Sequence, residues 1–250
     1  MSADESFHCP DWLKVVPDID ALNRAAAEEF ARCASEAISA QGRFTVALSG
    51  GNTPRAVYSL LAKEYGSSLL WGSIFFFFGD ERHVPPADPQ SNYRMANESL
   101  LSHVAIPPRN VYRILAELDA KDAAEQYQAV LEHFFQVTPG ELPRFDLIML
   151  GMGEDGHTAS LFPGTTALQE RSRLVVATHV EKFEADRITF TLPLLNAAAE
   201  VMVIVAGANK APVIRRIIQS PESPMYPVQR VHPHNGRLLW IVEQSAAATA

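Results

Sequence analysis

The sequence predicts an α/β fold: a doubly wound, mainly parallel sheet with helices on both faces, plus a few additional short strands. Short apolar runs such as 44–48, 145–150 and 201–205 carry almost no charge, which is typical of strands covered on both faces. Between them lie segments with apolar residues at helical spacing, such as 18–40 and 119–136. The apolar runs end in polar clusters, as strands do where a parallel sheet turns into its crossovers.

Composition sets the class of protein. The 250 residues are 47% hydrophobic and 20% charged, which suits one globular α/β domain over residues 1–250. We expect residues 1–17 and 244–250 to be loosely ordered ends. The net charge of −8 argues against nucleic acid and membrane surfaces as partners. Two cysteines, a polar start and the lack of a long apolar run predict a cytoplasmic protein.

Helices in the first half follow from apolar spacing and from residues typical of helix ends. Residues 18–40 carry apolar side chains at helical spacing. Thr53 is predicted to cap the next helix and Pro54 to occupy its first position, because the N–H that proline lacks would be unpaired there. Helical patterns follow at 91–104 and 119–136.

Strands are predicted where apolar or alternating residues lie between turn residues. Residues 74–78 contain four consecutive phenylalanines, and residues 187–191 alternate, so one face of the latter is expected to be wet or functional. The predicted strands are 44–48, 74–78, 111–115, 145–150, 174–177, 187–191, 201–205 and 238–242. A short helix is predicted at 193–199, another up to residue 218, and a loop rich in proline and histidine at 221–236.

A glycine-rich loop follows the predicted strand at 145–150. It holds three glycines together with Asp155 and His157. One interpretation is a tight turn whose polar groups only satisfy the backbone; the other is acid–base chemistry by His157 with Asp155 near it. The glycines also match a dinucleotide-binding pattern, but residues 163–164 (Pro-Gly) interrupt the helix it requires, and no acid lies near residue 176. We therefore reject nucleotide binding here.

A second glycine pair follows the predicted strand at 44–48. Gly50 and Gly51, placed before a helix, can form an anion cradle because free N–H groups and the helix dipole meet there. The alternative is an ordinary strand–helix turn. Ser49 is one residue away from a nucleophile-elbow pattern, but an acid and a histidine only two residues apart do not suit the usual triad.

Further charged residues follow the other two buried strands. Asp80, Glu81 and Arg82 follow 74–78, and Lys210 follows 201–205. The carboxyl ends of parallel strands meet at one edge, so all four polar clusters are expected in one crevice. Cations beside a helix N-terminus match a phosphate dianion, and histidine with acids matches proton transfer. The sequence thus indicates an enzyme acting on a small phosphorylated metabolite, and the acids and histidines lack the spacing of metal ligands.

Several of these segments together resemble the 6-phosphogluconolactonase family, within a superfamily that also contains glucosamine-6-phosphate deaminase. The resemblance reaches from the first predicted core strand to residue 240. The segments are SGGNTP from Ser49, GDER from Gly79, SNY from Ser91, GMGEDGHTASLFP from Gly151 and GANKA from Gly207.

The resemblance implies hydrolysis of 6-phospho-D-glucono-1,5-lactone to 6-phosphogluconate in the oxidative pentose phosphate pathway, without a metal or organic cofactor. It implies that His157 is the general base, that Asp155 orients it, and that Arg82 and Lys210 bind the phosphate or the developing oxyanion. The implied phosphate pocket consists of Ser49, Gly50, Gly51, Asn52 and Thr53. The partner is then a small sugar-phosphate lactone, and we expect a monomer or a weak oligomer.

Two alternatives remain open at this point. The first is a glucosamine-6-phosphate deaminase or isomerase. Resemblance to that family would imply an acid within a few residues after His157, and residues 158–163 contain none. The second is a sugar-phosphate-sensing module without catalysis. The sequence shows no helix-turn-helix-like extension or basic patch.

Overall fold

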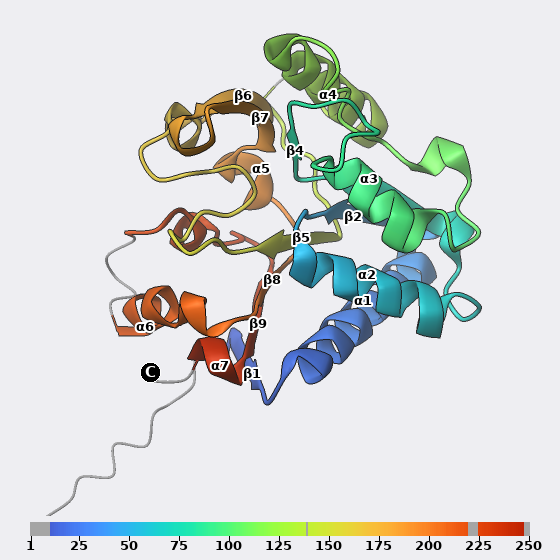
Figure 1. The fold of residues 1–250 in the computed structure, drawn as a ribbon. Coiled ribbons are helices and arrows are strands. Elements are labelled where there is room, and N and C mark those ends of the chain that lie inside the picture. Colours follow the sequence, from blue (N-terminus) through green and yellow to red (C-terminus); the bar gives the residue numbers. More distant parts are fainter. Residues whose placement is uncertain (1–10, 139, 220–224, 248–250) are drawn as a thin grey trace, which may run out of the picture.

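The computed structural model describes residues 11–138, 140–219 and 225–247, and Figure 1 shows their arrangement. A parallel six-stranded sheet has the order β1-β9-β8-β5-β2-β3, and a separate antiparallel sheet has the order β4-β7-β6. The strands are β1 Leu13–Val16, β2 Phe44–Leu48, β3 Ile74–Phe78, β4 Asp80–Arg82, β5 Leu147–Gly151, β6 Val175–Val180, β7 Ala185–Phe190, β8 Glu200–Val205 and β9 Arg237–Glu243. The sheet is therefore mainly parallel with a few added strands, as predicted.

Helices lie on both sides of the large sheet. Figure 1 shows α1 and α2 on one side and α6 and α7 on the other, while α4 packs against β6 and β7. The α-helices are α1 Ile19–Gln41, α2 Asn52–Tyr65, α3 Asn92–Ala96, α4 Ala120–Phe135, α5 Leu192–Leu195, α6 Ala211–Gln219 and α7 Gln244–Ala247. A π turn continues α3 at Asn97–Leu101, and 3-10 turns occur at Trp71–Ser73, Pro108–Asn110, Thr166–Gln169, Glu181–Phe183, Ala208–Lys210 and Pro227–Arg230. None of the helices in the described part of the chain combines the length and apolarity needed to cross a bilayer.

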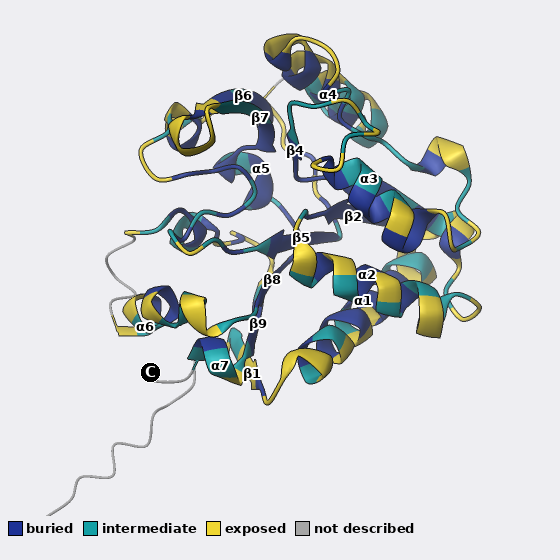
Figure 2. Cartoon of the chain, in the orientation of Figure 1, coloured by how far each residue is buried: buried dark blue, intermediate teal, exposed yellow. Residues whose placement is uncertain are grey.

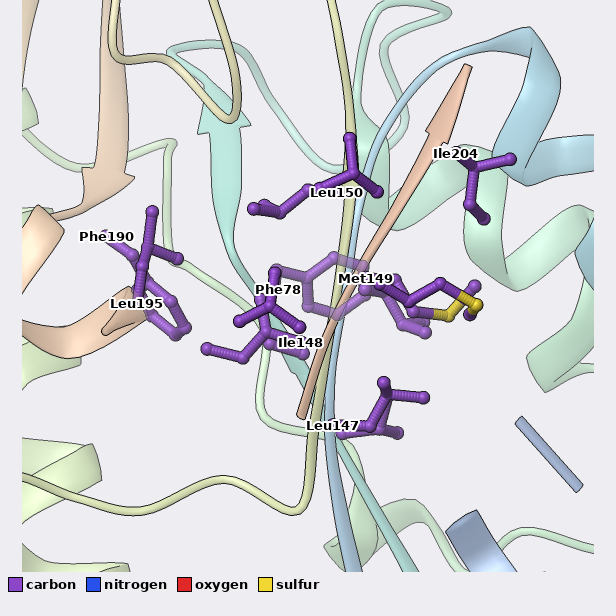
Figure 3. Packing of buried hydrophobic residues seen from close by; sticks show 14 of the residues in the cluster. Phe78, Leu147, Ile148, Met149, Leu150, Phe190, Leu195 and Ile204 are labelled. Atoms are coloured by element: carbon purple, nitrogen blue, oxygen red, sulfur yellow. The ribbon is translucent and has the colours of Figure 1, made fainter. Parts of the chain in front are cut away.

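One hydrophobic cluster joins both sheets and their helices. Figure 2 shows the central strands buried and the outer faces of the helices exposed. Figure 3 shows the side chains of Leu147 to Leu150 on β5 packed among residues of other elements, including Phe78, Phe190 and Ile204. Because β5 is buried on both faces, truncating one of its leucines to alanine should cost about 2–5 kcal/mol. This rigid strand supports the loop that begins at Gly151.

Gly79 connects the two sheets. Its N–H donates to the carbonyl of Leu48 at 3.0 Å, in line with the large sheet, and its carbonyl accepts from the N–H of Phe190 at 2.8 Å, in line with the small one. The chain therefore leaves β3 and enters β4 without a loop. As a result, the charged residues of β4 sit directly above the carboxyl end of the large sheet.

Most of the predicted elements are confirmed. The helix at 18–40 is α1, with Asp18 as its N-cap, and 119–136 is α4, capped by Asp119. The predicted strands 44–48 and 74–78 match β2 and β3. The remaining confirmed elements, with ends shifted by a few residues, are the helix at 91–104, the strands 145–150, 174–177, 187–191, 201–205 and 238–242, and the helices at 193–199 and up to 218.

Two predictions about the fold were wrong. Part of each expected loose end is ordered: β1 pairs with β9, with Leu13 opposite Trp240, and α7 follows β9 and buries Ala246. The rest of those ends, residues 1–10 and 248–250, lies outside the described residues. The strand predicted at 111–115 is a single bridge between Val111 and Phe76, because the chain follows β3 for only that residue. The apolar side chains of this segment still pack on the core, although its backbone is not a strand.

Candidate active site

A cleft of about 270 Å³ lies at the carboxyl ends of β2, β5 and β8, beside β4. It collects residues from all four of the predicted polar clusters. The predicted site residues that line it are Ser49, Gly50, Gly51, Asn52, Thr53, Arg82, His157 and Lys210. Asp155 does not line the cleft itself but contacts His157 from behind. The expected convergence of distant segments at one edge of the sheet is therefore present.

Asp155 forms a short contact with His157, which lines the cleft. Asp155 Oδ1 lies 2.5 Å from His157 Nδ1, and the same oxygen accepts from the backbone N–H of His157 at 3.3 Å. The loop folds back tightly, since the N–H of Gly153 donates to the carbonyl of His157 at 2.9 Å. A Cβ on Gly153 would lie 2.1 Å from the imidazole, so only glycine leaves room for this ring position.

Burial and the carboxylate act in opposite directions on the imidazole. Burial lowers the pKa of His157 below its ordinary value of 6.5, and the hydrogen bond from the ring to Asp155 offsets part of this decrease. Burial also disfavours the ionised form of Asp155, but hydrogen bonds from His157 and Lys182 lower its pKa to about 2. At neutral pH the pair is therefore a neutral imidazole beside a carboxylate. With Nδ1–H donated to Asp155, Nε2 is the nitrogen that can accept a proton.

The segment after His157 is tied to both sheets. Thr158 Oγ1 donates to the carbonyl of Gly151 at 2.8 Å, and Ser160 Oγ donates to Asp80 Oδ2 at 2.7 Å. Between them Ala159 has φ +47°, a left-handed conformation that costs energy for a residue with a side chain. These bonds fix the loop against β4, so the segments before and after His157 are both held by hydrogen bonds.

The glycine pair forms the expected helix N-terminus, with one correction. Helix α2 begins at Asn52, its N-cap is Gly51 with φ +108°, and no side chain caps it. The prediction that Thr53 caps this helix is therefore wrong. Gly51 allows the chain to enter the helix two residues earlier. An uncapped N-terminus presents backbone N–H groups to the cleft, which strengthens the case for an anion cradle.

Two buried side chains hold this glycine loop in place. Tyr58 Oη donates to the carbonyl of Ser49 at 2.9 Å and accepts from its N–H at 2.9 Å. Asn92 packs so closely on Gly50 that a Cβ there would lie 1.9 Å from Asn92 Oδ1. Asn92 Nδ2 in turn donates to the carbonyl of Asp80 at 2.9 Å. The glycine loop and β4 are thus locked to each other.

Two cations of the cleft lack a carboxylate partner. Arg82 donates through Nη1 to the backbone carbonyl of Gln90 at 2.5 Å, and Lys210 lies where the 3-10 turn Ala208–Lys210 enters α6. Within the described residues neither of them forms an ion pair, although other basic residues of the chain do. Asp80 lines the same cleft but forms no ion pair with either cation in the described residues, and two such cations beside a helix N-terminus fit a doubly charged anion.

Arg187 is a cation next to the cleft that the sequence did not single out. It lies directly opposite Arg82 in the β4–β7 pairing, so both side chains are on the same face of the small sheet. Its Nε is buried and has no hydrogen-bond partner among the described residues. Burial, and then the charge of Arg82, lowers the pKa of Arg187. The alternation at 187–191 indicates a strand with one wet or functional face, but it does not reveal which strand pairs with it.

Glu81 is outside the cleft, contrary to the expectation that it would join the crevice. It points away from Asp80 and Arg82 because side chains alternate along β4. It accepts from the backbone N–H groups of Asn92 at 2.6 Å and Tyr93 at 2.8 Å, and from Ser91 Oγ at 3.0 Å. Burial raises the pKa of Glu81 despite these bonds. Its role is to fasten the start of α3 beneath the site.

Ser49 lines the cleft, but within the described residues its hydroxyl has no hydrogen bond to a base. The hydroxyl donates to the carbonyl of Gly50 at 3.3 Å instead. A nucleophilic serine requires a hydrogen bond to a general base. Its contacts therefore fit a member of the glycine loop rather than a nucleophile.

A group of possible metal ligands occurs elsewhere. In the described part of the chain, Glu29, Cys33 and Glu200 bring their ligand atoms within 4.8 Å of one another. Glu200 begins β8, so the group lies at the end of the sheet opposite to the cleft. Arg32 and Arg237 already bind Glu200 at 2.8 and 3.1 Å, and burial raises the pKa of the Cys33 thiol. These side chains form an ion-pair network, and their donors do not fit a metal.

Comparisons with known proteins show which family the chain resembles. The family model described as glucosamine-6-phosphate isomerases/6-phosphogluconolactonase matches residues 17–240. A protein from Nostoc named 6-phosphogluconolactonase is 42% identical over 239 residues, covering 94% of this chain and 97% of the relative. A protein of the same name from Synechocystis is 43% identical over 214 residues, covering 85% and 87%.

Solved structures share the whole architecture. A 6-phosphogluconolactonase from Trypanosoma cruzi superposes with a TM-score of 0.85 at 27% identity, covering 97% of this chain and 98% of the other. One from Thermotoga maritima gives 0.80 at 29% identity, covering 92% and 98%. A monomeric glucosamine-6-phosphate deaminase gives 0.79 at 18% identity, a likeness that concerns the fold alone.

Proposed function

This chain belongs to the glucosamine-6-phosphate isomerase/6-phosphogluconolactonase family, and from that premise we propose that it is a 6-phosphogluconolactonase. It hydrolyses 6-phospho-D-glucono-1,5-lactone to 6-phospho-D-gluconate, a step of the oxidative pentose phosphate pathway. The observation that supports this best is the Asp155–His157 pair beside a cleft whose cations, Arg82 and Lys210, form no ion pair within the described residues. A neutral base and spare positive charge are what hydrolysis of a phosphorylated lactone needs.

The base is His157. Its Nε2 accepts a proton from a water molecule as the water oxygen bonds to the lactone carbonyl carbon, while Asp155 keeps the proton on Nδ1 and stabilises the imidazolium that forms. The carbonyl oxygen becomes an oxyanion. When the tetrahedral intermediate collapses, the bond between the carbon and the ring oxygen breaks, and the imidazolium returns its proton to that oxygen. The product is an open-chain acid, and the base is neutral again.

The cations and the glycine loop bind the phosphate and the oxyanion. The phosphate carries a charge near −2 at neutral pH, and the chain as a whole carries −8, so binding requires local positive charge. Arg82, Lys210 and Arg187 supply it, together with the N-terminus of α2. Residues Ser49 to Thr53 line the phosphate pocket, where backbone N–H groups act as donors.

One domain contains the entire site. A single hydrophobic cluster joins the elements that carry it, which supports one α/β domain as the working unit. We infer that a monomer or a weak oligomer is active, since one chain supplies every group used above. We also place the reaction in the cytoplasm, on the sequence features that predicted it.

The test is to offer the purified protein two substrates. With the lactone, acid release measured at constant pH should exceed the spontaneous hydrolysis rate by several orders of magnitude. With glucosamine 6-phosphate, no ammonia should appear. Ammonia release would favour the deaminase, and binding of the lactone without hydrolysis would favour a sensing module. The absence of an acid from residues 158–163 favours the lactonase over the deaminase.

A further inference from the structure

The turn between β6 and β7 reaches the back of the Asp155–His157 pair. We refer to residues 181–184 as the hairpin tip. It consists of the 3-10 turn Glu181–Phe183, followed by Glu184 with φ +47°. Lys182 Nζ lies 3.2 Å from Asp155 Oδ2, and the Phe183 side chain is exposed although it is large and apolar. Neither residue lines the cleft, so neither is placed to bind the substrate directly.

Lys182 completes the hydrogen bonding of Asp155. One carboxylate oxygen, Oδ1, accepts from His157, and the other, Oδ2, accepts from Lys182. A carboxylate held through one oxygen can turn about its side-chain bond, whereas one held through both has a fixed plane. The plane of the carboxylate sets the orientation of the imidazole, because His157 Nδ1 is hydrogen-bonded to Asp155 Oδ1. Lys182 is therefore in contact with the group that orients the base.

Phe183 contacts Phe162, the aromatic residue that packs on the imidazole. The ring of Phe162 stacks on His157 with an interplanar angle of 25°, and Phe183 meets Phe162 edge-on with centroids 5.7 Å apart. The Arg187 guanidinium lies 5.4 Å from the Phe183 centroid on the same hairpin. Phe183 therefore supports the aromatic ring that covers the imidazole.

We propose that the hairpin tip positions the catalytic imidazole, with Lys182 acting through Asp155 and Phe183 acting through Phe162. This inference rests on the proposed function, because it assigns a role in the same reaction. Lys182 and Phe183 are positioning residues and touch no reacting atom. The hairpin thereby links the small sheet to catalysis: β7 carries Arg187, and the tip holds the base.

The charges around the imidazole give this proposal a distinctive signature. Asp155 from its loop and Asp80 from β4 raise the pKa of His157, while Lys182 from the hairpin tip lowers it. Arg82 and Lys210 line the same cleft. Burial would still lower the pKa of His157 if Lys182 were removed, but one positive charge that disfavours the imidazolium would be lost, so the pKa should rise. A residue with a purely structural role would not shift this titration.

The experiment uses Lys182→Met and Lys182→Arg in the full-length protein, with Lys121→Met as the matched control. Lys121 is exposed on α4 and forms an ordinary surface pair with Glu125 at 3.7 Å. Side-chain NMR titration of His157 should show its pKa raised by about half a pH unit in Lys182→Met, as expected for one partly screened charge. In the same variant kcat at high pH should fall about three- to tenfold, the effect of a misoriented base, with KM nearly unchanged.

The conservative variant and the control complete the test. Lys182→Arg keeps the charge and the donor, so both kcat and the titration should return close to wild type, and Lys121→Met should change neither. Phe183→Ala should lower kcat without moving KM, whereas Leu70→Ala, which truncates another exposed apolar side chain, should not. Wild-type kcat and an unshifted His157 titration in Lys182→Met would overturn the proposal, as would an increase in KM alone, which would make Lys182 a substrate ligand.

The two proposals can fail separately. If the wild type does not hydrolyse the lactone, the proposed function is wrong, and the NMR titration still decides whether Lys182 acts on His157 through Asp155. If the wild type hydrolyses the lactone but the Lys182 and Phe183 variants match it, the lactonase function stands and the role of the hairpin tip is refuted.

Discussion

Arg82 and Arg187 lie directly opposite each other on neighbouring antiparallel strands, and within the described residues no carboxylate pairs with either. Like charges opposite each other destabilise a sheet. Asp80 and Glu81 are close but use their oxygens for Ser160, Asn92 and Tyr93 instead. This arrangement fits an anion, and we propose that anion binding offsets its cost to folding.

The first prediction concerns these cations. Arg187→Met should reduce kcat/KM by roughly 10- to 100-fold, since a charge-assisted hydrogen bond contributes about 1.5–3 kcal/mol. Arg82→Met and Lys210→Met should behave in the same way. The matched control is Arg24→Met, because Arg24 pairs with Glu64 at 3.5 Å on the exposed side of α1. The measurement is steady-state kinetics: wild-type kcat/KM in the Arg187, Arg82 and Lys210 variants alike would place the phosphate elsewhere.

The second prediction concerns pH. His157 acts as a base only when neutral, and burial lowers its pKa below 6.5 even though Asp155 opposes the shift. As the pH falls through that lowered pKa the imidazole becomes protonated, so kcat should decrease on the acidic side, with a midpoint below 6.5 and full activity at pH 7. The profile is measured from pH 4.5 to 8 after subtraction of buffer hydrolysis. A midpoint above 6.5 would contradict the assignment.

The third prediction concerns the space beside the imidazole. Gly153→Ala places a Cβ 2.1 Å from the His157 ring, so the ring must move. Misplacing a catalytic group by about 1 Å can cost roughly 10²-fold, and kcat should fall by that order. The control is Gly72→Ala, where an added Cβ meets nothing within 4 Å and φ is ordinary. Equal activity of the two variants would show that the ring position is not critical.

The fourth prediction concerns the support of the glycine loop. Tyr58→Phe removes a buried hydroxyl that bonds both the N–H and the carbonyl of Ser49, leaving two buried groups unpaired. Urea denaturation should show a loss of about 1–3 kcal/mol, and KM should rise as the loop loosens. In Tyr112→Phe the lost hydroxyl has no hydrogen bond to the described residues, so its stability should stay within about 0.5 kcal/mol of wild type. Similar losses in both variants would remove the special role of Tyr58.

The sequence predicts the site well where the argument depends on strand ends. Apolar strands followed by polar clusters, combined with the rule that parallel strands end at one edge, place His157, Lys210 and the glycine loop together before any coordinates are known. Strand β4 is not among the predicted strands, because its three residues are all charged and show no apolar alternation. Side chains alternate along this strand, so Arg82 faces the cleft and Glu81 does not.

Other parts of the site depend on contacts that one sequence does not contain. Arg187 joins the cations only because β7 pairs with β4 in a register that puts it opposite Arg82. Lys182 contacts Asp155 from the turn of a hairpin, although the two residues are 27 positions apart in the sequence. The start of α2 was misplaced because Gly51 adopts φ +108°, which allows an earlier helix start than the Thr53-Pro54 signal indicates.

The central claim is that a neutral His157, oriented by Asp155, activates water for attack on a phosphorylated lactone. The most direct measurement compares lactone hydrolysis by wild type and His157→Asn, each corrected for the spontaneous reaction, together with the affinity of each protein for the product 6-phosphogluconate. The account predicts a fall in kcat of about 10²–10⁴-fold with product affinity nearly unchanged. A variant that retains wild-type kcat would contradict it.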